Sequence, residues 1–219
     1  MTLIVAALTK KKGFMFGDRV GTIPEKEGSA TPLTINGIKL QIKGNVYFKD
    51  YGPKIFSIFD NSLYIAMAGD KRKFSLFYNT LNSIKVENFN SYINQYWTKY
   101  QDESPDQLLV LSKGLDSVKV EAYFKVEEPR CNTYDHITYI PKDEKLLFVA
   151  FGSGASAFLG YIQALNDMFE KQYKKALADE TLLQWEEKFI KEIKSIYSDI
   201  HHQIDSVGDE VDIVSLELK

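Results

Sequence analysis

The sequence has little of what marks secreted, nucleic-acid-binding or membrane proteins. Its one cysteine, Cys131, cannot form a disulfide within the chain, and this favours a reducing compartment. Lys and Arg number 27 against 30 Asp and Glu, and the short Lys10-Lys11-Lys12 cluster forms no extended basic surface, so we expect no nucleic-acid partner. No apolar run approaches the roughly 20 residues that span a bilayer, so we expect no membrane partner.

The start of the chain carries no targeting signal. Residues 1–8 are apolar but have no basic leader, and the turn residues Lys10 to Gly13 interrupt them well short of a signal peptide. We therefore expect the first residues to belong to the mature protein, and the protein to be cytoplasmic. With 219 residues, 44% of them hydrophobic and 26% charged, the chain has the size and composition of one large or two small globular domains.

The order of apolar patterns predicts an α+β fold. Short apolar runs bounded by turn residues predict strands over 3–8, 14–16, 54–59, 63–68, 108–112, 118–126, 136–140, 145–151 and 211–218. Helical spacing predicts helices over 71–86, 89–100, 155–178 and 180–203. Since this order lacks βαβ alternation, it favours two antiparallel sheets stacked between two helical layers.

Five short motifs occur in a fixed order along the chain. They are Thr2-Leu3-Ile4-Val5, Gly17-Asp18-Arg19, Lys54 at the start of a strand, Ala68-Gly69 at the end of the next, and Gly152-Ser153-Gly154 before a helix. This set resembles the proteasome β-subunit and HslV-type family of N-terminal nucleophile (Ntn) hydrolases. The resemblance covers nearly the whole chain, and it implies a single domain over 1–219 with a four-layer αββα sandwich.

The resemblance also implies a role for each matching residue. Thr2 matches the threonine nucleophile once Met1 is removed. Asp18 and Lys54 match the conserved acid and base, Gly69 matches the oxyanion-hole glycine, and Ser153 matches the serine of the GSG motif. The C-terminal aspartate of the family's site is harder to place. Asp205 is the first choice, and Asp199 is the other candidate.

These residue types suit one chemistry. A threonine hydroxyl is a poor nucleophile and must give its proton to a base, and an N-terminal threonine has its own α-amine nearby, with a pKa of about 7.7 to 8.0. Lys54 would stabilise the alkoxide-like oxygen and Asp18 would hold that lysine, so an Asp18–Lys54 ion pair is the first geometry we expect. The N–H of Gly69 would face the developing oxyanion, and Ser153 and Asp205 would orient the groups around Thr2.

A metal site is the less favoured interpretation of the histidines near the C-terminus. His201 and Asp205 share a helix face at i, i+4, beside His202, but two ligands at a helix end without a third partner are usually solvated polar surface. We expect no metal and no cofactor.

The sequence therefore predicts a threonine peptidase that cleaves peptides or unfolded proteins through an acyl-enzyme on Thr2. By analogy with the family, it would assemble as a homo-oligomeric ring, with an ATP-dependent unfoldase as a possible partner. Two alternatives stay open: a small-molecule amidase on the same fold, and a catalytically silent structural or interaction subunit. The chain departs from the family in a long Gly- and Pro-containing insertion at about 21–45, with a hairpin expected around Asn36-Gly37. It would form a substrate lid, an inter-subunit hairpin or a steric block.

Overall fold

The structure is a computed structural model. It describes residues 2–23, 31–35, 38–42, 46–48, 52–59, 61–69, 71–81, 91–93, 95–96, 106–128, 131–142 and 145–218. Met1 and parts of the insertion and of the predicted helices over 71–86 and 89–100 lie outside these residues.

The first sheet has four antiparallel strands in the order β12-β1-β2-β13. Their bounds are Leu147–Gly152, Leu3–Leu8, Lys12–Asp18 and Val211–Glu217. All six residues of β1 are buried, because alternate side chains enter two different cores: Leu3, Val5 and Ala7 face the helices, while Ile4, Ala6 and Leu8 face the other sheet. A central strand covered on both faces explains the unbroken apolar run at the start of the chain.

The second sheet has five antiparallel strands in the order β11-β10-β9-β8-β7. Their bounds are Cys131–Tyr139, Val118–Glu128, Gln107–Lys113, Leu63–Ala68 and Ile55–Ile58. Alternation in β10 divides its side chains between two cores: Val118, Val120 and Ala122 face the first sheet, and Tyr123 faces the opposite way.

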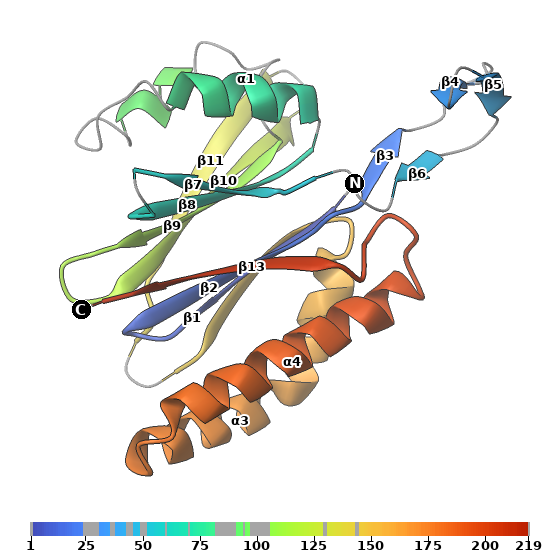
Figure 1. The fold of residues 1–219 in the computed structure, drawn as a ribbon. Coiled ribbons are helices and arrows are strands. Elements are labelled where there is room, and N and C mark those ends of the chain that lie inside the picture. The colour runs from blue at the N-terminus through green and yellow to red at the C-terminus, as the bar shows by residue number, and fades with distance from the viewer. Residues whose placement is uncertain are drawn as a thin grey trace.

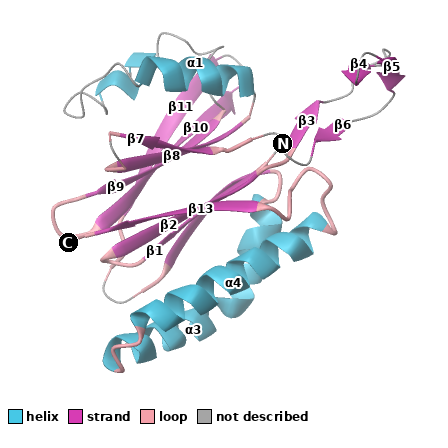
Figure 2. Ribbon diagram, in the orientation of Figure 1, coloured by secondary structure: helices cyan, strands magenta, loops and turns pink. Residues whose placement is uncertain are grey.

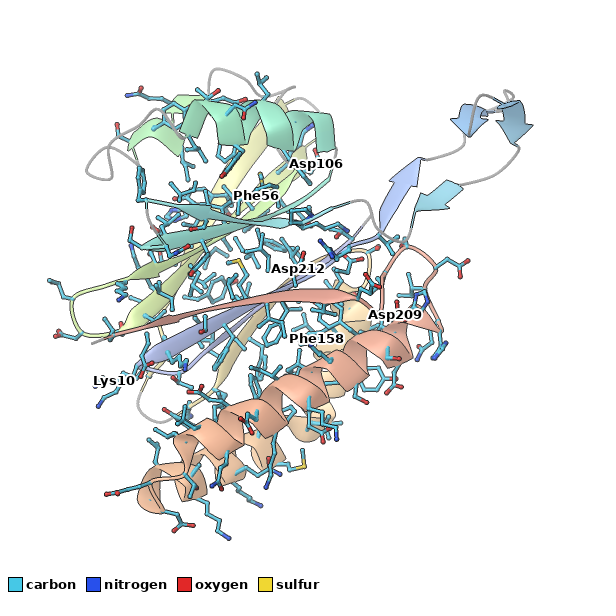
Figure 3. All side chains as sticks on the ribbon, viewed as in Figure 1. Lys10, Phe56, Asp106, Phe158, Asp209 and Asp212 are labelled. Carbon is cyan, nitrogen blue, oxygen red and sulfur yellow. The ribbon has the colours of Figure 1, made fainter. Side chains whose placement is uncertain are left out.

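Helices cover the outer faces of both sheets (Figures 1 and 2). Helix α1 (Lys71–Leu81) lies over the five-stranded sheet, and α3 (Ala155–Ala178) and α4 (Leu182–His201) lie over the four-stranded one. Figure 3 shows side chains filling the spaces between the layers, with Phe158 of α3 completely buried against the four-stranded sheet. The predicted α+β class with two antiparallel sheets is confirmed.

The insertion forms two separate two-stranded ribbons. Strand β3 (Gly21–Ile23) pairs with β6 (Val46–Phe48), and β4 (Thr31–Ile35) pairs with β5 (Ile38–Ile42). Ile35 lies opposite Ile38, so β4 and β5 pair on either side of the predicted hairpin turn. The turn residues themselves, Asn36 and Gly37, lie outside the described residues. In Figure 1 both ribbons project from the layers near the N-terminus.

Candidate active site

The predicted site residues come from element ends that meet at one end of the two sheets. Thr2 precedes β1 and Asp18 ends β2, and these two strands form an antiparallel hairpin in which Ile4 pairs with Gly17. Lys54 precedes β7, and its carbonyl accepts a hydrogen bond from Met67 N–H (3.2 Å), close to the end of β8. Val211, the first residue of β13, lies opposite Asp18. The topology therefore collects residues that are far apart in the sequence.

Thr2, Asp18 and Lys54 form a buried hydrogen-bonded triad. Their exposed fractions are 3%, 0% and 6%. The Thr2 hydroxyl donates to Asp18 Oδ1 and accepts from Lys54 Nζ, and Lys54 Nζ lies 2.6 Å from the same Asp18 oxygen. The expected Asp18–Lys54 ion pair is present, and the threonine hydroxyl lies directly against both charges.

Backbone groups provide the remaining hydrogen-bond partners of Lys54 and Asp18. Lys54 also donates to the carbonyl of Val20 (2.6 Å). Asp18 Oδ1 accepts from Leu3 N–H (3.2 Å), and Oδ2 accepts from Gly208 N–H (2.9 Å). A buried ion pair is stable only when its remaining lone pairs and protons are satisfied, and these contacts satisfy them.

Ser153 reaches the threonine from the opposite strand of the sheet. Its hydroxyl donates to the Thr2 carbonyl (3.3 Å) and lies 2.9 Å from the Ser206 hydroxyl. The adjacent Gly152 has a φ of +99°, and a Cβ atom there would lie 1.9 Å from the Thr2 carbonyl oxygen. Only glycine allows the backbone this conformation and this close approach.

Gly69 directly follows β8, at the same end of the sheets. Its φ of +125° lies in the region that favours glycine, and a Cβ atom would lie 2.5 Å from Asp106 Oδ2. Gly69 is exposed, whereas the preceding Ala68 is buried. Asp106 and Asp209 both lie at this end of the molecule in Figure 3. The role of Gly69 as the oxyanion-hole glycine stays a prediction.

The loop between α4 and β13 contributes differently from the prediction. Asp205 is exposed, as is Asp199 on α4, and the described part of the chain contains no hydrogen bond from either carboxylate to the triad. The next residues make the contacts instead: Ser206 bonds Ser153, and Gly208 bonds Asp18. No sequence signal distinguishes a backbone N–H donor such as that of Gly208.

Tyr197 of α4 lies against the backbone of both β1 and β2, the strands next to Thr2 and Asp18. Its buried hydroxyl lies 3.4 Å from the Leu3 carbonyl and 3.3 Å from the Phe16 carbonyl, to which it donates. Burial, and secondarily the nearby Asp18 carboxylate, raise the pKa of Tyr197 well above its ordinary value. The phenol therefore remains a neutral donor that links β1 to β2 beside the triad.

No family model matches this chain, and no curated protein matches it significantly. Among the described residues, no His, Cys, Asp or Glu side chains form a group of three or more that could hold a metal ion. No helix in the described segments is long and apolar enough to cross a membrane.

Proposed function

We propose that this protein is a threonine-type amide hydrolase that uses Thr2 as its nucleophile after removal of Met1. One observation carries the proposal: the Thr2 hydroxyl lies in a buried site between the Lys54 ammonium and the Asp18 carboxylate. A threonine with only a structural role does not need a buried lysine against its oxygen, because burying that charge costs free energy.

The same proposal assigns the fold. The layer order seen in Figure 1, helix, five-stranded sheet, four-stranded sheet and helix pair, is that expected for the αββα sandwich of the Ntn hydrolases. The first strand starting directly after Thr2 is consistent with this assignment.

The reaction follows from the groups around Thr2. Removal of Met1 frees the Thr2 α-amine, which takes the hydroxyl proton as Oγ1 attacks the substrate carbonyl carbon. Lys54 stabilises the negative charge on Oγ1 during attack, and Gly69 N–H would donate to the carbonyl oxygen as it becomes an oxyanion. The amine then gives its proton to the departing amine, and the Thr2 ester that remains is the acyl-enzyme.

Hydrolysis repeats these steps with water. The α-amine accepts a proton from a water molecule that attacks the ester carbonyl, and it returns this proton to Oγ1 as the acid product leaves. Asp18 orients Lys54 throughout and holds the Thr2 end of β1 through Leu3 N–H. Ser153 fixes the Thr2 carbonyl, and with it the direction of the α-amine.

The proposal includes the setting implied by the family: a cytoplasmic homo-oligomeric ring that takes peptides or unfolded proteins, with an ATP-dependent unfoldase as a possible partner. A small-molecule amidase would need no ring, so light scattering on the purified protein distinguishes the two. A ring mass supports the peptidase, and a monomer supports the amidase.

Turnover of fluorogenic peptides by wild type, Thr2→Ser and Thr2→Ala tests the function. We expect activity in wild type, reduced activity with serine, and none with alanine, while thermal melts show that all three proteins are folded. Undiminished turnover in T2A would place the chemistry elsewhere. A folded, Met1-free wild type that hydrolyses no peptide or amide would support the silent-subunit alternative.

A further inference from the structure

The loop between α4 and β13 carries three consecutive buried residues, two of which hydrogen-bond to residues of the site. Ser206 bonds Ser153, Val207 is completely buried in the core beneath the four-stranded sheet, and Gly208 N–H donates to Asp18. The conformation of this loop therefore determines which donors reach the triad.

One peptide group in this loop is held at both ends. The Val207 carbonyl oxygen lies 2.6 Å from His201 Nδ1, and the Gly208 N–H of the same planar peptide unit donates to Asp18 Oδ2 at 2.9 Å. Since a carbonyl oxygen only accepts, His201 Nδ1 carries the proton of this bond. The chain of bonds runs from His201 through one peptide to the catalytic carboxylate.

The residues packed around the Val207–Gly208 peptide leave it little room, but they are not the hydrogen-bond donor to its carbonyl. A Cβ on Gly208 would lie 2.8 Å from Val20 Cγ2, and a Cβ on Gly154 would lie 2.8 Å from Val207 Cγ2. The loop therefore packs closely against Val20 and Gly154, with no room for a side chain on either glycine. The rotation of the peptide plane is then set by its polar ends, where His201 is the donor and Asp18 the acceptor.

We propose that His201 is a positioning residue that orients Asp18 through the Val207–Gly208 peptide. It lies at the last position of α4, half-buried, and touches neither Thr2 nor Lys54 by a hydrogen bond in the described residues. The bond from His201 also polarises the peptide, which strengthens the Gly208 bond to Asp18. The catalytic part of this inference rests on the proposed threonine hydrolase function, whereas the positional part does not.

Three variants test the role. His201→Leu removes the donor, and His201→Asn retains an N–H donor close to the place of Nδ1. His202→Leu is the matched control, because His202 is the exposed neighbour. We expect kcat to fall about tenfold or more in H201L because a catalytic group is misplaced, with KM within about twofold. H201N and H202L should stay within about threefold of wild type.

Amide hydrogen exchange at Gly208 and the ¹⁵N shifts of the His201 ring give readouts that need no activity. In wild type, H201N and H202L we expect a protected Gly208 amide, and in H201L one that exchanges at least about tenfold faster. The wild-type His201 ring should carry a proton on Nδ1. Equal exchange in H201L and wild type, or an unprotonated Nδ1, would overturn the inference.

The two sets of readouts separate this inference from the proposed function. If wild type has no Thr2-dependent turnover, the hydrolase function fails, and the Gly208 and His201 measurements alone decide whether His201 positions Asp18. If turnover depends on Thr2 but kcat in H201L equals that of wild type, the inference about His201 is wrong and the function stands.

Discussion

Lys54 Nζ lies 2.6 Å from Asp18 Oδ1, and the two side chains are 7% and 0% exposed. The pair joins the start of β7 in one sheet to the end of β2 in the other. It thus connects the two sheets at the point where the Thr2 hydroxyl lies.

Replacing Lys54 should cost stability as well as activity. In Lys54→Met the Asp18 carboxylate stays buried without its cation, and we expect a loss of about 3 kcal/mol in the free energy of unfolding. The control is Lys73→Met, since the Lys73–Asp106 pair at 3.2 Å is partly exposed and should contribute less than about 1 kcal/mol. Urea unfolding measures both. Equal losses in the two variants would contradict a buried, compensated pair.

Gly152 should tolerate no side chain. In Gly152→Ala the new Cβ would meet the Thr2 carbonyl at 1.9 Å, in a backbone conformation with a φ of +99°, so we expect a loss of about 3 kcal/mol or more. Gly160 is the matched control, because it lies in α3 with open space around it. Gly160→Ala should leave stability unchanged or raise it by up to about 1 kcal/mol. Thermal melts with equal shifts for both variants would rule out the close approach at Thr2.

Substitutions at the neighbouring positions Ser206 and Asp205 should have different effects on kcat. Ser206→Ala removes the partner of Ser153, which holds the Thr2 carbonyl, and kcat should fall about tenfold. Asp205→Asn changes an exposed carboxylate and should leave kcat within about twofold. Steady-state kinetics on fluorogenic peptides measure both. A larger effect in D205N would favour the assignment of Asp205 that the sequence suggests.

Tyr197 should make the fold sensitive to alkaline pH. Its pKa is raised above the unfolded value of 10.0, so its contribution is complete below pH 10 and is lost as the pH rises toward the folded pKa. In that interval each pH unit costs about 1.4 kcal/mol for this tyrosine.

Tyr197→Phe should lose about 1 kcal/mol at pH 7 through its hydrogen bonds, and its stability should fall less steeply than that of wild type above pH 10. Burial also raises the pKa of Tyr123. Tyr123→Phe is therefore the comparison that shows how much each tyrosine contributes to the fall in stability at alkaline pH. Denaturant unfolding between pH 7 and 11 measures this. A wild-type slope in Y197F would contradict a buried neutral phenol.

The sequence is a good guide to the fold where side chains enter a core. Alternation and apolar runs locate β1 and β10, and helical spacing locates α3 and α4 to within a few residues. The pattern underestimates β2 and β11, which begin at Lys12 and Cys131 rather than at 14 and 136. β11 is an edge strand, and its first residues, Cys131-Asn132-Thr133-Tyr134, show no alternation of apolar and polar residues in the sequence.

The residues of the site likewise divide into those that the sequence predicts and those that it does not. Side-chain chemistry and motif order suggest Thr2, Asp18, Lys54 and Ser153, and the structure brings all four together. Gly208 acts through its backbone N–H and Val20 through its carbonyl, and every residue type except proline offers both groups. Such contacts depend on where the loop lies in space, which residue types alone do not determine.

The proposed chemistry requires that Thr2 becomes a free N-terminal nucleophile. The test is mass spectrometry of the protein from its source cells, before and after reaction with a peptide β-lactone, because this electrophile acylates a reactive hydroxyl. We expect a chain that lacks Met1 and gains one acyl group, located on Thr2 by peptide mapping and absent in Thr2→Ala. A chain that retains Met1, or one whose acyl group lies on another residue, would contradict it.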